Sequence, residues 1–255
     1  MPLTTTDCII LRSQPYSETS KILRLLTQDH GVRSVIAKGA LRPRSTFGGV
    51  LEPFARGRAA IYLSNNRDLH TLGSFDLTRT GQALGRDLVR FALASLLAEL
   101  VLRTASEEAD PALYGRFAAA IDRIETTDPI ILEPRGLAEA WALIAYLGFA
   151  PIVEHCVSCG RGLGAEEESY FDYAAGGTRC LECGGDRSGG RTRLLPAHAR
   201  QALAQFIRGE VFIPERTAAH WALLSRFLAY HLSDAGPLNS LQFLNDAISA
   251  GMRRE

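Results

Sequence analysis

Four cysteines in two closely spaced pairs are the residues of this chain whose types and spacing most clearly define a chemistry. Cys156 and Cys159 form one Cys-x-x-Cys pair, and Cys180 and Cys183 form a second pair after twenty intervening residues. A two-residue gap turns successive sulfurs toward the same side of a tight turn, so the pairs can supply four thiolates to one tetrahedral centre. The pattern predicts one zinc ion per chain. Because four sulfurs fill the coordination shell, this Zn2+ would be structural and not catalytic.

The alternatives for these four cysteines are chance spacing and a thiol redox pair. His155 stands beside the first predicted ligand, but the quartet is already complete, so we expect this histidine outside the ligand set. The fifth cysteine, Cys8, stands alone in an apolar stretch and is expected to be a small buried hydrophobe. Paired metal-binding cysteines fit a reducing compartment, which favours a cytoplasmic protein.

A basic loop near the N-terminus is the second stretch with a definite chemistry. Lys38, Arg42 and Arg44 lie in a segment that holds no Asp or Glu from residue 30 to residue 51. Residues 1–80 carry eleven Lys or Arg against six Asp or Glu, so the basic charge of a chain with zero net charge is concentrated there. The loop is predicted to contact phosphates, and a merely solvated loop is the alternative. The wider set of DNA-binding candidates is Arg33, Lys38, Arg42, Arg44, Arg56 and Arg58.

Two further groups of side chains are weaker candidates for contacts with nucleic acid. A second basic patch after the cysteines comprises Arg187, Arg191, Arg193, His198 and Arg200, and a solvated rim around the metal module is its alternative. Aromatic side chains that could stack on bases are Tyr16, Phe47, Phe54, Tyr62 and Phe75, and packing in a core is the favoured alternative for each.

The elements that must position these residues fall into two types. Short β-branched and apolar runs separated by turn residues predict strands at 7–11, 21–26, 32–37, 55–63 and 68–75, which suit a small closed barrel of the OB-fold type over residues 1–80. Apolar residues at helical spacing predict helices at 84–104, 111–124, 134–147, 196–207, 214–231 and 239–249. The chain is therefore predicted to be a multi-domain protein of mixed β and α class. An α-helical domain over residues 81–255 carries a four-cysteine zinc-ribbon insertion at about 152–194.

Several function classes lack their motifs in this sequence. There is no Gly-x-x-x-x-Gly-Lys-Ser/Thr loop, no histidine paired with a nearby glutamate as in zinc hydrolases and deaminases, and no Gly-x-Ser-x-Gly elbow. No apolar run approaches the ~18 residues of a membrane span, and the first residues lack the pattern of a secretory signal. These observations predict a binding protein that is not an enzyme and does not contact a membrane.

The N-terminal residues resemble the RecO family of bacterial DNA repair proteins and recombination mediators. The segments that carry the resemblance are 8–11 (CIIL), 15–23 (PYSETSKIL), 26–31 (LTQDHG), 37–40 (AKGA) and 45–54 (STFGGVLEPF). Their order and spacing extend over about seventy residues. The remainder resembles the family more loosely, and the zinc insertion is present in only part of it.

The resemblance implies an OB-fold that binds single- and double-stranded DNA and anneals complementary strands. It implies partnership with RecR and with the C-terminal tail of single-stranded-DNA-binding protein (SSB), and indirectly with RecA, in a RecF-type pathway. Candidates for binding that tail lie in the late helices, where apolar residues stand beside Arg200, Arg208 and Arg226. These apolar residues are Phe206, Leu223, Leu224, Phe227 and Leu228. The alternatives are a zinc-ribbon scaffold for protein interaction in transcription or RNA processing, and a nuclease with an unrecognised acidic site.

Overall fold

The computed structural model describes residues 2–64, 68–184, 192–232 and 236–251. The chain divides into two compact units, one formed by residues 1–125 with 243–255 and the other by residues 126–242. Arg187 and Arg191 of the predicted second basic patch lie outside the described residues. Among those residues, no helix has both the length and the apolar character needed to cross a membrane.

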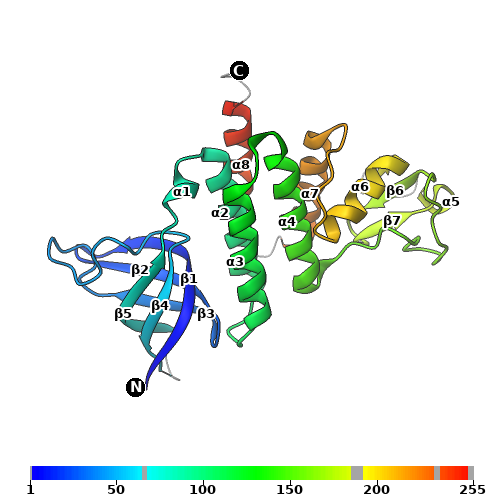
Figure 1. Cartoon of the computed structure of the whole chain (residues 1–255). Helices are drawn as coiled ribbons and strands as arrows, with labels where there is room; N and C mark the ends of the chain where they lie inside the picture. Colours follow the sequence, from blue (N-terminus) through cyan, green and yellow to red (C-terminus); the bar gives the residue numbers. More distant parts are fainter. Residues whose placement is uncertain (1, 65–67, 185–191, 233–235, 252–255) are drawn as a thin grey trace. The chain divides into compact units, whose positions relative to one another are not determined.

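The first unit begins with a closed five-stranded barrel (Figure 1). Its strands are β1 (Leu3–Tyr16), β2 (Ser20–Thr27), β3 (Gly31–Ala37), β4 (Arg56–Tyr62) and β5 (Leu69–Arg79). Their order around the barrel is β1-β2-β3-β5-β4, with β3 and β5 parallel and all other neighbours antiparallel. This closed arrangement of five strands confirms the predicted OB-fold barrel. β1 extends beyond the predicted 7–11 at both ends, and β5 extends beyond the predicted 68–75 at its C-terminal end, because further residues continue the pairing there.

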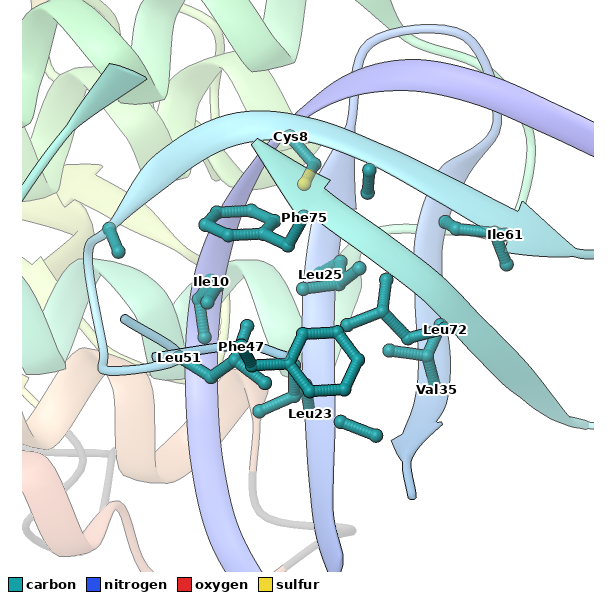
Figure 2. Close-up of a cluster of buried hydrophobic side chains, with 13 residues drawn as sticks. Cys8, Ile10, Leu23, Leu25, Val35, Phe47, Leu51, Ile61, Leu72 and Phe75 are labelled. Carbon is teal, nitrogen blue, oxygen red and sulfur yellow. The ribbon is translucent and has the colours of Figure 1, made fainter. Parts of the chain in front are cut away.

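Side chains alternate between the interior and the exterior of the barrel. Leu23 and Leu25 of β2 point into the apolar core, together with Val35 of β3 (Figure 2). Phe47 and Leu51 of the long loop after β3 also enter this core. Of the aromatic residues considered for base stacking, Phe47, Phe54 and Phe75 are buried, whereas Tyr16 and Tyr62 are exposed. The packing alternative therefore holds for those three phenylalanines.

Helices complete the first unit. They are α1 (Gln82–Gly85), α2 (Leu88–Thr104), α3 (Pro111–Thr126) and the residues of α8 (Asn239–Gly251) from 243 onward. The carboxylate of Asp87 caps α2 by accepting hydrogen bonds from the amides of Val89 and Arg90, at 2.9 and 3.0 Å. The predicted division at residue 80 separates strands from helices, whereas α1, α2 and α3 belong to the same compact unit as the barrel.

The second unit combines helices with a small sheet. Its helices are α4 (Leu132–Ile144), α5 (Leu181–Gly184), α6 (Ala197–Ile207) and α7 (Thr217–His231). Its strands β6 (Ser169–Asp172), β7 (Gly177–Arg179) and β8 (Thr192–Leu195) pair in the order β7-β6-β8. The sequence analysis did not predict these strands, because each has only three or four residues.

An aromatic core joins the helices of the second unit to its sheet. The ring of Phe227 lies 5.1 Å from that of Trp141 and 6.2 Å from that of Phe171, measured between centroids. The candidate side chains for gripping a peptide, Phe206, Leu223, Leu224, Phe227 and Leu228, are all buried. They pack in the core of this unit, and Leu223 among them also lines a cavity.

Candidate nucleic-acid interface and metal centre

The basic loop that follows β3 is anchored at both ends. The amide of Leu41 donates a hydrogen bond of 2.9 Å to the carbonyl of Thr19, which fastens the loop to the β1–β2 turn. Buried Phe47 and Leu51 fasten its far end to the barrel core. Between these anchors, the amide of Arg42 donates to the carbonyl of Gly39, whose φ of +73° is easily adopted by glycine. The loop is therefore a series of hydrogen-bonded turns with fixed ends.

The three predicted cations of this loop are exposed. In the described part of the chain, none of Lys38, Arg42 and Arg44 forms an ion pair. Pro43 fixes φ between the two arginines and limits how far they can move relative to each other. Exposed, unneutralised cations on an anchored loop attract polyanions without first breaking an internal contact.

The three strand arginines of the candidate set differ from the loop cations because each meets a carboxylate. Arg33 pairs with Glu107 at 2.6 Å, and Arg56 pairs with Asp122 at 2.7 Å. Arg58 faces Asp7 at 3.4 Å in an exposed and longer contact. Arg33 and Arg56 therefore link the barrel to the helical part of its own unit, while Arg58 remains the most accessible of the three.

The sequence analysis missed two arginines on the barrel. Arg12 of β1 and Arg24 of β2 are register partners on the outer surface of the barrel. We call this surface the β1–β2–β3 face and define it as Arg12, Gln14, Tyr16, Ile22, Arg24, Ser34, Ile36 and Lys38. It contains three cations and no carboxylate. Strand alternation in the sequence indicates that each arginine points outward, but only the register places them opposite each other.

The four paired cysteines come together in the second unit. All four sulfur atoms lie within 4.8 Å of one another, and the Sγ atoms of Cys159 and Cys180 are 4.0 Å apart. None of the four forms a disulfide. Four sulfurs at about 2.3 Å from a tetrahedral zinc lie about 3.8 Å apart. The donor set and its spacing therefore fit a tetrathiolate metal ion.

Tight backbone turns orient the sulfur atoms of both cysteine pairs. In the first pair, the amide of Gly160 donates to the carbonyl of Cys156 at 2.8 Å, and Gly160 has a φ of +75°. In the second pair, the amide of Cys183 donates to the carbonyl of Cys180 at 3.1 Å. Gly184 then packs on the ring of Tyr170, where a Cβ atom would lie 2.2 Å from Cδ2. No side chain fits there, so the second turn requires glycine.

The thiols of this cluster do not ionise alike. Burial opposes ionisation of Cys156, but hydrogen bonds from the backbone of Cys159, Cys180 and Ser158 outweigh it and lower its pKa to about 6. The neighbouring thiols of Cys180 and Cys159 raise the pKa of Cys183 to about 12. Four thiolates at this distance repel one another unless a cation compensates their charge. A divalent metal ion would supply that compensation.

Arg200 lies inside the second unit and not on the predicted second basic patch. It is buried, and its guanidinium donates hydrogen bonds to the carbonyls of Val153, Gly164, Ala165 and Glu167. The inclusion of Arg200 in a second basic patch on the surface was therefore wrong, and so was the solvated-rim alternative for this residue. Its side chain ties α6 to the loops that carry the first cysteine pair.

A cavity of about 180 Å³ lies beside the sheet of the second unit. Its apolar walls include Phe171, Leu195, Pro214 and Leu223, while the exposed side chains of Arg193 and Arg216 also line it. In the described ranges, neither arginine forms an ion pair. His220 lines the same cavity, and its buried Nδ1 atom has no hydrogen-bond partner. Burial, together with the nearby charge of His198, lowers the pKa of His220 to about 4.

The fold and these sites define a class of protein. A closed OB-type barrel with unpaired surface cations is the architecture of an oligonucleotide-binding module, and here it is joined to a helical region with a four-cysteine cluster. Comparison with known families agrees with this class. Residues 1–80 match the model of the Recombination protein O N-terminal domain, and residues 85–242 match that of the Recombination protein O C-terminal domain. The chain belongs to the RecO family of DNA repair and recombination proteins.

Individual relatives match along almost the whole chain. The DNA repair protein RecO of Synechococcus elongatus is 30% identical in an alignment of 258 positions that covers 96% of each chain. The DNA repair protein RecO of Geobacter metallireducens is 30% identical over 245 residues, covering 96% of this chain and 98% of the relative. The DNA repair protein RecO of Myxococcus xanthus is 30% identical over 242 residues, covering 93% of this chain and 95% of the relative.

Proposed function

We propose that this chain is a DNA-binding recombination mediator of the bacterial cytoplasm that anneals complementary strands. It binds single- and double-stranded DNA, and together with RecR it helps to load RecA onto DNA covered by SSB. It breaks no covalent bond. Binding two polyanions close together requires a positive surface that screens their repulsion.

The observation that carries this proposal is the set of unpaired cations on the anchored loop. Lys38, Arg42 and Arg44 are exposed and meet no carboxylate among the described residues, in contrast to Arg33, Arg56 and Arg58 on the strands. An anchored loop loses little further conformational freedom on binding, so its charges are already positioned for phosphates. A scaffold that only binds proteins has no need for such a uniformly basic loop.

The proposed cofactor is one structural zinc ion held by Cys156, Cys159, Cys180 and Cys183. The mutual distances of the four sulfurs support it. With four protein ligands the ion has no open position for water or substrate, so it would stabilise the ribbon and supply no catalysis.

The proposed site for the tail of SSB is the cavity beside β8. Its apolar walls suit an apolar or aromatic side chain, and Arg193 and Arg216 suit neighbouring acidic residues.

Replacing both arginines with alanine is expected to weaken binding of an acidic, aromatic-ended tail peptide. A peptide whose acidic residues are replaced by asparagine is the control. Equal affinity of the wild type and the variant for the acidic peptide would place the tail elsewhere.

The experiment that tests the main proposal is annealing of complementary strands coated with SSB. The purified chain is expected to accelerate annealing, and the Arg42→Ala, Arg44→Ala double variant to accelerate it less. A chain that binds neither single strands nor duplexes would favour the scaffold alternative. Labelled DNA incubated with the chain and Mg2+ should remain intact, and its cleavage would favour the nuclease alternative.

A further inference from the structure

Two arginines lie directly opposite each other on the barrel. The antiparallel register of β1 and β2 pairs Arg12 with Arg24, and the next pair along, Ser13 with Leu23, faces the opposite side of the sheet. Because Leu23 points into the barrel core, Arg12 and Arg24 both point outward. The Cβ atoms of such a directly opposed pair are about 5 Å apart.

Nothing in the described part of the chain neutralises this pair. Arg24 is flanked on its other side by Ser34, and Ser34 by Leu69, so no carboxylate stands in the row. Neither Arg12 nor Arg24 forms an ion pair there, and the buried Nε atom of Arg24 has no hydrogen-bond partner. By contrast, Arg33, Arg56 and Arg58 each face a carboxylate.

This arrangement is unfavourable in the free protein. Like charges directly opposite each other across two strands repel, and a buried donor without a partner forfeits a hydrogen bond. A phosphate placed between the two guanidinium groups removes the repulsion. It lies between two positive charges, and each planar guanidinium can donate two hydrogen bonds to its oxygens.

We propose that Arg12 and Arg24 form a clamp for one phosphate, and that a bound single strand runs from this clamp along the β1–β2–β3 face to the basic loop. The proposal rests on the DNA binding proposed above and deepens it by assigning the path of the strand. The opposed geometry distinguishes this clamp from the separate cations of the loop.

The remaining residues of the face fit such a path. From the clamp, the next row is Gln14, Ile22 and Ile36, and the row after that holds Tyr16 opposite Ser20. Successive rows lie about 7 Å apart, since they are two residues apart along a strand. Tyr16 is 51% exposed, so its ring is free to stack on a base. Lys38 follows Ala37, the register partner of Lys21, and leads into the loop with Arg42 and Arg44.

The test uses the full chain with the variants Arg12→Gln, Arg24→Gln and the double variant. Binding of a fluorescent single strand is measured across a range of salt concentrations. The double variant is expected to bind at least about tenfold more weakly. The slope of log affinity against log salt concentration should fall in magnitude by about 0.7, because the two arginines share one phosphate contact. Two separate phosphate contacts would instead lower it by roughly 1.4. Stability at low salt should be unchanged or higher, because the repulsion is removed.

Variants at Arg86 and Tyr16 test whether the effect is specific to the clamp and whether the Tyr16 ring stacks on a base. Arg86→Gln removes an exposed arginine between α1 and α2 and is expected to leave affinity and slope unchanged. Tyr16→Ala should weaken binding about fivefold or more, and Tyr16→Phe should restore it, because stacking needs the ring and not the hydroxyl.

The outcomes separate the strand path from DNA binding itself. If the Arg42→Ala, Arg44→Ala variant loses affinity while the clamp variant binds DNA as the wild type does, the path is wrong and DNA binding by the loop stands. If the clamp variant keeps DNA but loses a polyglutamate peptide, the face binds an acidic protein segment, which also overturns the path. A wild-type chain that binds no DNA would overturn the proposed function as well.

Discussion

Arg56 of β4 donates two hydrogen bonds to the carboxylate of Asp122 of α3, from Nη1 to Oδ2 at 3.1 Å and from Nη2 to Oδ1 at 2.7 Å. Its Nη2 also donates to the carbonyl of Ala118 at 2.8 Å. Arg79 of β5 reaches the same carboxylate at 2.5 Å. The barrel and α3 are therefore joined by a network in which two guanidinium groups share one acid.

This network predicts different consequences for two neighbouring arginines of β4. Arg56→Ala is expected to lower the free energy of unfolding by about 1–3 kcal/mol, because it removes a bidentate, half-buried pair. Arg58→Ala should change it by less than about 1 kcal/mol, since its contact with Asp7 is long and exposed. Urea unfolding of both variants measures the difference. Equal effects of the two substitutions would show that the pairing of Arg56 does not stabilise the unit.

The loop variant Arg42→Ala with Arg44→Ala is predicted to change the salt dependence of DNA binding. If each arginine neutralises one phosphate, the log–log slope for single strands should fall in magnitude by about 1.4. All sequences should be weakened alike, because phosphates carry no base identity. Thermal stability should hardly change, since exposed loop charges contribute little. Fluorescence anisotropy at several salt concentrations tests this, and Arg86→Ala, which removes one exposed arginine outside the loop, should leave the slope unchanged. Wild-type affinity and slope in the loop variant would mean that the loop is only solvated.

Removal of a cysteine from the cluster is predicted to remove the metal. We expect one zinc per chain in protein purified without chelator, and none in Cys156→Ser or Cys180→Ser. Structural zinc contributes on the order of 10 kcal/mol to a small module, so the ribbon should unfold in these variants. The helices have their own aromatic core, so part of their structure should survive and DNA binding should weaken only modestly.

Cys8 provides the control for metal analysis. It is buried in the barrel, and burial raises its pKa to about 12, so Cys8→Ala should keep the zinc. A wild-type chain without zinc would contradict the metal assignment.

His220 is predicted to make the second unit sensitive to acid. Its pKa in the folded chain is about 4, below the ordinary value of 6.5, because burial disfavours its charged form. Between these two values the unfolded chain binds a proton that the folded chain does not. Stability is therefore complete above pH 6.5 and falls as the pH decreases toward 4.

The matching experiment compares the wild type with His220→Leu, which has no proton to bind. On lowering the pH from 7 to 5, the wild type should lose about 2 kcal/mol more stability than the variant. Parallel pH profiles of the two proteins would show that His220 is not the group responsible.

Much of the fold could be predicted because its signals are local. Alternation around Leu23 and Leu25 indicates a strand with one buried side, and the period of apolar residues in α3 indicates a helix. The Cys-x-x-Cys spacing is equally local, since each pair needs only a tight turn. The short strands β6, β7 and β8 escaped prediction because three or four residues hold too little pattern, and their pairing stabilises them.

The candidate residues could be recognised from the sequence alone, namely four cysteines in two turns and a run of cations without acids. The tertiary structure decided which of these cations are free, because that depends on residues far away along the chain. Arg33 meets Glu107 and Arg56 meets Asp122 across 74 and 66 positions. Arg200, by its sequence a surface cation, is enclosed by carbonyls from loops more than thirty residues away. Arg12 and Arg24 face each other only because the β1–β2 register brings them together, and strand register is set by the burial of a whole face.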